Sequence, residues 1–465
     1  MWTSFDCTNA DKTRVYLERS KSSLINLWLD GSTTPSPDDP FLQVIPNSID
    51  RLKLLSVTGI PANLHSTSPH LSHRAPLLGG LDTDGSAGSW PQRNAVLTTA
   101  LFNGDLSSLR AFRLQSVRTE LPWRNMTNLT SFVLCRMSPG DLTIKQLLDF
   151  LESTPRLGDI KLDSATPVTG GQDGRLVSLD CLKWMSILWG EPSSLLLDHL
   201  LIPVGTRLTR WVTSFDRIVE VHLPKSLDNL RNIPDFTKIV LHIGKWYTHM
   251  RLSGPNGQLC LASQAGTPYK ALESLAQFDT SKIEWLKIVS RNRRLSDSAT
   301  KALLPLKNLR TLTLYRCTDP YDFICALYLD EKSSEVVTCP NLEELVLVLR
   351  TNAEKFDITN LIRTVAARAS RGVKLKTIRI DGGKDKLRNP EDVLELRKHV
   401  LHVEYRPEVN VIDSDNDVSA EERIQMVGGF ALVLNVSLNF LRSVRITDSQ
   451  GDVPLGRFHM INFLG

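Results

Sequence analysis

The sequence has few cysteines and no long apolar run. Its seven cysteines are scattered, odd in number and never spaced as Cys-x-x-Cys, which argues against a zinc finger and against a disulfide framework. No uninterrupted apolar stretch of about 18 residues is present, so we expect no transmembrane helix. The first residues also lack the apolar centre of a signal peptide. Together these absences favour an intracellular protein, cytoplasmic or nuclear.

Charge of one sign is also lacking. The 55 basic and 51 acidic side chains leave a net charge of +4, so neither nucleic acid nor an anionic membrane is expected as a partner. No phosphate-binding loop, dinucleotide fingerprint or Gly-x-Ser-x-Gly elbow occurs, and we expect neither catalysis nor a cofactor. His65, His70 and His73 share one segment but have no carboxylate or cysteine at ligand spacing, which favours a polar loop over a metal site.

What the sequence does contain is a recurring apolar pattern. The stretch from Leu309 through Leu312 and Leu314 to Cys317 matches the leucine-rich-repeat template. Three apolar residues at this spacing also arise by chance, but an Asn precedes several copies, at Asn128, Asn308 and Asn341. Further copies begin at Ile49, Leu109, Leu129, Leu157, Leu179, Phe236, Ile283, Leu342 and Leu375, with a weaker one at Leu441.

The segments between these copies have helical patterns. Residues 141–151 and 357–369 carry apolar side chains on one helical face, and Asn389 followed by Pro390 is typical of a helix start. Strands alternating with helices predict parallel strands joined by helical returns. A chain of 465 residues also exceeds a single core of about 250–300 residues. We therefore predict an α/β, irregular leucine-rich-repeat-like solenoid, with a parallel sheet on the concave face and helices on the convex face.

Several stretches resemble fungal F-box proteins. The resemblance rests on the Trp-Thr-Ser opening and the Tyr16 to Ser22 run, and on similar stretches at 126–162, 179–203 and 396–406. It implies the substrate-binding part of a cullin-RING ubiquitin ligase receptor. The F-box itself is absent, because Met1 falls just after the position where it would end. A Skp-type adaptor is therefore expected as a partner only if an F-box lies upstream.

These patterns divide the chain into three parts. Residues 1–48 are expected to form an N-terminal helical cap that follows the position of the missing F-box. Residues 49–406 are expected to form the solenoid, with a mobile loop insertion at 61–94 that is rich in Pro, Gly, Ser and His. Residues 407–465 are expected to hold an acidic linker and a C-terminal tail.

One position in each repeat is expected to carry the function. The side chain between the last two apolar anchors should point onto the exposed sheet face. At that position the copies have Val133, Val240, Thr313 and Val346 together with six basic residues, which we predict to bind the partner: Lys53, Arg113, Lys161, Lys183, Lys287 and Arg379. Such a basic ribbon, strongest in the first half, suits a protein target with an acidic or phosphorylated segment. The alternative is that these residues only keep exposed strands soluble.

The sequence therefore predicts a non-catalytic protein-binding solenoid. Two other functions stay open. One is a leucine-rich-repeat scaffold with no ubiquitin role. The other is an enzyme of an unrecognised α/β fold, which would need titratable residues converging in one deep pocket.

Overall fold

The computed structural model describes most of the chain from Ser4 to Arg406. The predicted acidic linker and tail lie outside the described residues, and so does much of the predicted loop insertion. The described segments are 4–6, 10–31, 44–59, 68–85, 95–97, 101–119, 125–137, 142–163, 174–188, 196–211, 223, 227–233, 235–244, 247–264, 271, 274–290, 298–317, 320–328, 337–349, 356–382 and 390–406.

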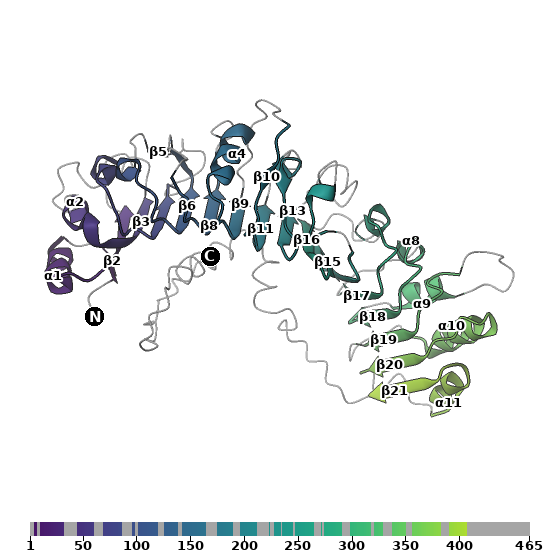
Figure 1. The fold of residues 1–465 in the computed structure, drawn as a ribbon. Coiled ribbons are helices and arrows are strands. Elements are labelled where there is room, and N and C mark those ends of the chain that lie inside the picture. The colour runs from purple at the N-terminus through teal and green to yellow at the C-terminus, as the bar shows by residue number, and fades with distance from the viewer. Residues whose placement is uncertain are drawn as a thin grey trace.

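The described residues form a mixed α/β structure built on one open, mostly parallel sheet of 17 strands. The strands follow one another along the inner side of an arch, and α4, α8, α9 and α10 lie on its outer side (Figure 1). In spatial order the strands are β1 (Ser4–Asp6), β2 (Ile25–Gly31), β3 (Leu52–Gly59), β4 (Gly80–Asp84), β6 (Ala111–Gln115), β8 (Ser131–Cys135), β9 (Asp159–Asp163), β11 (Trp184–Leu188), β13 (Arg207–Trp211), β16 (Gly257–Gln264), β15 (Tyr247–Gly254), β14 (Lys238–Ile243), β17 (Trp285–Ser290), β18 (Thr311–Tyr315), β19 (Glu344–Val348), β20 (Thr377–Asp381) and β21 (His402–Arg406).

The remaining elements connect these strands. Two small strand pairs join β5 (Ala95–Leu97) to β7 (Val117–Thr119) and β10 (Val177–Ser178) to β12 (Leu200–Leu201). The helices are α1 (Ala10–Ser20), α2 (Val44–Ser48), α4 (Ile144–Glu152), α8 (Ser298–Leu303), α9 (Tyr321–Leu327), α10 (Ile358–Ser370) and α11 (Pro390–His399). Short 3-10 turns are η1 (Ile49–Arg51), η2 (Ser68–Ser72), η3 (Leu101–Gly104), η4 (Leu227–Asn229) and η5 (Ser274–Gln277). Among the described helices, none combines the length and the apolar character needed to cross a membrane.

A repeated backbone arrangement fixes the register of neighbouring strands. Just before β6, the carbonyl of Arg110 accepts the N–H groups of Thr130 and Ser131 at 2.8 and 3.0 Å. The same arrangement joins Thr130 to Gly158 and Asp159, Glu284 to Arg310 and Thr311, Arg310 to Glu343 and Glu344, and Glu343 to Lys376 and Thr377. Because each N-terminal strand end is tied to the next, side chains at equivalent positions form straight rows across the sheet.

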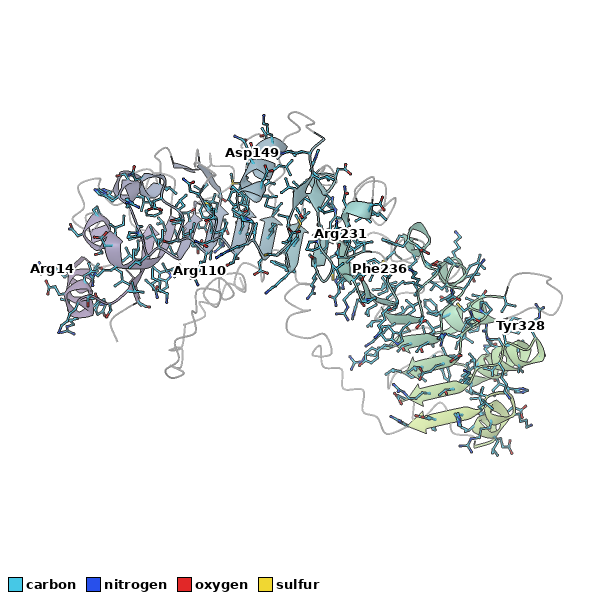
Figure 2. The ribbon with its side chains drawn as sticks, in the orientation of Figure 1. Arg14, Arg110, Asp149, Arg231, Phe236 and Tyr328 are labelled. Atoms are coloured by element: carbon cyan, nitrogen blue, oxygen red, sulfur yellow. The ribbon has the colours of Figure 1, made fainter. Side chains whose placement is uncertain are left out.

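The core lies between the sheet and the helices. Successive strand residues point to opposite faces, so Phe112 on β6 and Phe132 on β8 enter the core, where α4 contributes Phe150. The rings of Phe132 and Phe150 lie 4.5 Å apart between centroids. Figure 2 shows side chains projecting from both faces of the sheet, so the face opposite the core also carries side chains.

The predicted helices begin close to where the sequence indicates. Helix α4 starts at Ile144, and Thr143 caps it by accepting from the Gln146 N–H, with Gln146 completing a capping box. In α10, the Asp357 side chain accepts from the Thr359 N–H, as expected for a start at residue 357. Helix α11 begins at Pro390; Asn389 lies outside the described residues.

The middle of the sheet departs from the predicted all-parallel order. Strand β15 runs antiparallel to both β14 and β16, so these three strands form a meander inserted between β13 and β17. The reason is a two-residue hairpin loop between Gly254 and Gly257. Gly257 has φ +143°, and a Cβ on Gly254 would lie 2.3 Å from the Asp235 carbonyl oxygen, so both positions require glycine.

Two boundary predictions also missed strands. Residues 1–48, expected to be a helical cap, contribute β1 and β2 to the sheet. The alternation of Ile25, Leu27 and Leu29, all buried, is the signal that could have shown β2. Strand β4 lies inside the predicted loop insertion at 61–94. It was missed because its sequence sends only Leu81 and Thr83 toward the core and is otherwise polar.

Candidate functional site

The face of the sheet opposite the core carries, on each of the 16 strands from β2 to β21, one residue at the level of Arg113. We call this set the sheet-face row. In spatial order it contains Trp28, Ser56, Asp82, Arg113, Val133, Lys161, Ser186, Thr209, Cys260, Arg251, Val240, Lys287, Thr313, Val346, Arg379 and Glu404. Arg113, Lys161, Lys287 and Arg379 are members, as predicted. Asp82, Arg251 and Glu404 were not foreseen.

Lys53 and Lys183 are not in the row, so the positions predicted for these two residues were wrong. Lys53 lies at a register shift between β2 and β3, and Ser56 takes the row position on β3. Leu54 followed Lys53 in the predicted pattern as an apolar anchor. Its side chain lies on the face of the sheet opposite the core, beside Ala111. Lys183 precedes β11, where Ser186 is level with Lys161. Both errors come from apolar residues that satisfy the pattern in a shifted register.

In the first half of the sheet the basic row members are buried and paired. Arg113 is 5% exposed; its guanidinium lies 3.3 Å from the Asp82 carboxylate and donates to Gln115 Oε1 at 2.5 Å. Gln115 in turn donates to Asp84 Oδ2 at 3.0 Å. Burial raises the pKa of the Asp82 carboxyl, against the opposing effect of Arg113. This part of the row is therefore an internal polar network, not an open cationic surface.

Lys161, the next basic member of the row, is also buried beside a carboxylate. Its side chain is 1% exposed and lies 3.9 Å from the Asp163 carboxylate. Burial lowers the pKa of its amine. Beside it, Val133, Cys135 and Leu188 form a small apolar cluster on the sheet face. The predicted basic ribbon, strongest in the first half, is therefore not what the structure shows.

In β17–β21 the same face is more open; we call this part the open sheet face. The Lys287 amine lies 4.4 Å from the centroid of the Tyr315 ring, within range of a cation–π contact. Arg379 donates to Asp381 at 3.1 Å and keeps 36% of its side chain exposed. Glu404 and Arg406 pair at 2.9 Å and are each about half exposed. Cationic, aromatic and acidic groups are accessible together here.

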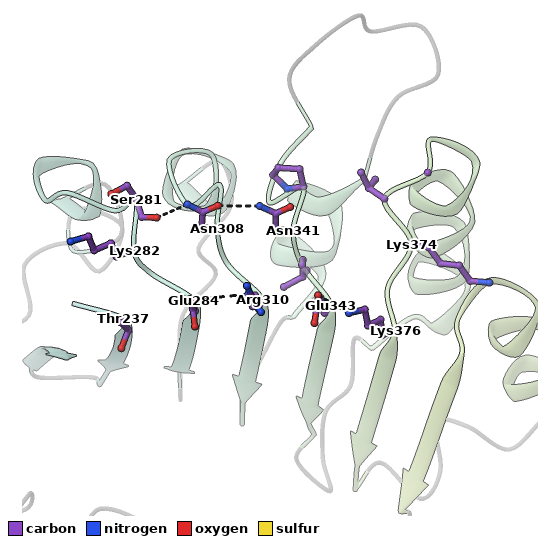
Figure 3. Close-up of a pocket in the computed structure, with 14 residues that line it drawn as sticks. Thr237, Ser281, Lys282, Glu284, Asn308, Arg310, Asn341, Glu343, Lys374 and Lys376 are labelled. Atoms are coloured by element: carbon purple, nitrogen blue, oxygen red, sulfur yellow. Dashed lines mark hydrogen bonds and ion pairs between the residues drawn. The ribbon is translucent and has the colours of Figure 1, made fainter. Parts of the chain in front are cut away.

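A groove crosses the N-terminal ends of β17–β20 (Figure 3). Its volume is about 790 Å³, and its charged lining residues are Lys282, Glu284, Arg310, Glu343, Lys374 and Lys376. One wall is a ladder of amides. Asn308 Nδ2 donates to the Ser281 carbonyl, and Asn341 Nδ2 donates to Asn308 Oδ1 at 3.1 Å. The ladder ties together the loops that precede β17, β18 and β19.

Charges alternate along the floor of this groove. Equivalent positions are occupied by Glu284, Arg310, Glu343 and Lys376, because each follows a buried residue just before its strand and shares the same backbone hydrogen-bond pattern. The Arg310 guanidinium lies 4.0 Å from Glu284, whereas Lys376 and Glu343 pair at 2.7 Å. The hydrogen bond from Lys376 lowers the pKa of the Glu343 carboxyl. Sequence reasoning missed this site, although the alternating charges directly after the first apolar residue of each predicted copy could have indicated it.

Other reactive groups offer little chemistry. Burial raises the pKa of the Cys135 thiol to about 11 and that of Cys339 to about 12, which makes both poor nucleophiles. Of the three clustered histidines, His70 and His73 lie in the described part of the chain and His65 does not. Across the described segments, no three His, Cys, Asp or Glu side chains come together as a metal site would require.

Comparison of the chain with protein-family models gave no match, and comparison with curated proteins gave none either. The resemblance drawn from the sequence therefore remains an interpretation, and the functional argument depends on the geometry of the open sheet face and the groove.

Proposed function

We propose that this protein is a non-catalytic, leucine-rich-repeat-type solenoid that binds a protein target on its open sheet face. The observation that carries the proposal is the mixed, accessible chemistry of that face. Lys287 on β17 lies against the Tyr315 ring on β18, and Arg379 follows on β20 with Val346 of β19 between them; aromatic and cationic residues of these kinds anchor many protein interfaces. The repeated backbone ties between strands support the repeat classification, because stacked equivalent units produce this regularity.

The resemblance to fungal F-box proteins extends the proposal to a ubiquitin ligase. In that role the chain would hold the target, and an F-box encoded upstream would hold a Skp-type adaptor and the cullin. No bond is made or broken by the chain itself. Such a receptor acts in the cytoplasm or the nucleus. A scaffold with no ubiquitin role would use the same open sheet face without the adaptor.

Co-purification followed by mass spectrometry tests both levels of the proposal. The chain, a version extended upstream in the gene, and a Lys287→Glu/Arg379→Glu double variant are expressed in parallel. The control is Lys145→Glu/Lys398→Glu, which reverses two exposed charges on helices α4 and α11. We expect a target shared by the chain and the extended form, lost at least tenfold in the open-face variant and retained in the control.

The outcomes separate the alternatives. Recovery of the Skp-type adaptor and cullin only by the extended form supports the receptor. A target recovered without ligase components by either form removes the ubiquitin role and leaves the scaffold. Equal loss of the target in the open-face variant and the helix control contradicts binding on the open sheet face.

A further inference from the structure

The groove at the N-terminal ends of β17–β20 has the dimensions of a peptide site. Neighbouring strands lie about 4.8 Å apart, so the three spacings from β17 to β20 span about 14 Å. An extended peptide rises about 3.3 Å per residue and covers that length with four or five residues. The volume of about 790 Å³ is also in the range of pockets that bury a ligand of this size.

The groove is held in a fixed shape. The backbone N–H groups of Arg310, Glu343 and Lys376 donate at 2.8 Å to the carbonyl oxygens of Glu284, Arg310 and Glu343, respectively, which sets the spacing of these residues. On the wall, Asn308 and Asn341 donate their amide hydrogens to the neighbouring loops. Because these amides are engaged within the protein, they shape the groove, and the charged side chains are left to recognise a ligand. A preformed site of this kind loses little freedom on binding.

The charges of the groove favour an anionic ligand. Four lining residues are basic and two are acidic, an excess of two positive charges. Lys374 is exposed and makes no ion pair within the described residues. Arg310 is 61% exposed and only loosely paired, since its Nε lies 4.0 Å from Glu284. A guanidinium and an amine are therefore available for carboxylates, and Arg can grip a carboxylate with two parallel hydrogen bonds.

We propose that this groove binds an extended peptide segment carrying acidic side chains, with Arg310 and Lys374 contacting its carboxylates. The groove lies at the strand ends and is separate from the open sheet face, so the proposal does not depend on the function proposed above. An acidic peptide is favoured over a basic one because a basic segment would have to displace Lys376 from Glu343 and would meet Lys282 and Lys374.

One carboxylate of the groove competes with such a ligand. Glu343 holds the Lys376 amine at 2.7 Å, and this pairing neutralises a cation that faces the groove. Replacing Glu343 with Gln keeps the size of the side chain, removes its negative charge and releases the Lys376 amine. The proposal therefore predicts that Glu343→Gln tightens binding, while charge reversal at Arg310 or Lys374 weakens it. A merely structural role for these residues would not produce opposite signs.

The test is fluorescence anisotropy with the full chain. The probe is fluorescein-labelled Gly-Asp-Glu-Asp-Glu-Gly, and Gly-Asn-Gln-Asn-Gln-Gly is its neutral counterpart. We expect the acidic peptide to bind about tenfold more tightly than the neutral one, and less tightly as salt is raised. Arg310→Glu and Lys374→Glu should weaken binding about fivefold or more, and Glu343→Gln should tighten it about twofold. Lys374→Gln provides a milder variant, and thermal melts confirm that each variant folds.

Lys398→Glu, on α11, and Lys145→Glu, on α4, serve as controls and should leave the affinity within about twofold. Equal binding of the acidic and neutral peptides overturns the proposal. So does a loss in either control as large as that in Lys374→Glu, or a Glu343→Gln variant that binds more weakly than the unmodified chain.

Discussion

On β4–β9 the charged side chains of the sheet-face row are buried, whereas on β17–β21 the charged side chains of the same row are accessible to solvent. Arg113 and Lys161 are almost wholly buried and face Asp82 and Asp163. Arg379 occupies the equivalent position on β20, also beside an aspartate, yet keeps about a third of its side chain in contact with solvent. The residue types are alike, and only the surroundings differ.

This difference shows what burial does to a charged row. A buried cation must be paired, because an uncompensated charge away from water costs several kcal/mol. In the Arg379–Asp381 pair the carboxylate is only 10% exposed, but the arginine is 36% exposed, so solvent weakens the pairing and the guanidinium can also contact a ligand. In the proposed function, the first half of the row therefore stabilises the fold and the second half binds the target.

The largest effect is expected at Arg113. Arg113→Met should lower the free energy of unfolding by about 3–5 kcal/mol, because it breaks a buried pair and strands the Asp82 carboxyl. Arg379→Met, the same change at the equivalent row position, should cost less, about 1–2 kcal/mol, because the arginine is 36% exposed although the Asp381 carboxylate is 10% exposed. Denaturant unfolding of the two variants measures the difference. Equal losses would erase the distinction between the two halves.

A smaller effect is expected on the helix side of the second half. Arg368 on α10 is fully buried and donates to the carbonyl oxygens of Thr338 and Cys339, both at 2.8 Å. Arg368→Met should cost about 2–3 kcal/mol, since it leaves two buried carbonyls without these charged donors. Arg363→Met, an exposed change on the same helix, is the control and should cost about 0.5 kcal/mol or less. If both variants melt alike, the helix side does not stabilise this half as argued.

The smallest effect concerns the junction between the halves. His249 on β15 is buried beside His242, Arg251 and Arg207. Burial is the main cause that lowers the pKa of His249 to about 3, and the charges of these neighbours add to it. The unfolded chain binds this proton below an ordinary pKa of about 6.5. The contribution of neutral, buried His249 to the stability of the fold is therefore complete above about pH 6.5 and falls as the pH drops toward 3.

At pH 5 the loss should be about 2 kcal/mol relative to pH 7.5. His249→Phe should be less sensitive to acid by about that amount, and His402→Phe, on the exposed strand β21, should behave like the unmodified chain. Melting temperatures of the three proteins at both pH values give the answer. Identical acid sensitivity in all three would show that His249 is not buried as a neutral side chain.

Much of the fold could be predicted because its physical signal is periodic. The copies at Leu129 and Leu309 preceded true strands, since two buried anchors in each strand and one before it fix the register. The copies at Ile49 and Leu179 did not give the correct register, because neighbouring apolar residues satisfy the same spacing. The meander was missed because its hairpin is specified by Gly254 and Gly257, which a repeat search does not weigh.

The candidate site was less predictable. Which residues share the row follows from strand pairing, but whether Lys161 or Lys287 is accessible depends on tertiary packing around each strand. Arg251 joins the row only through the antiparallel β15, so no parallel-repeat pattern could include it. The groove depends on the alignment of Glu284, Arg310, Glu343 and Lys376, which appears only once the register is known.

The most direct test of binding on the open sheet face is photo-cross-linking in cells. A benzophenone amino acid replaces Thr313, which lies on that face, or Thr300, which is exposed on α8. Our account predicts a discrete cross-linked target from position 313 and none from position 300. A target captured from position 300 alone would place binding on the helix side and contradict the account.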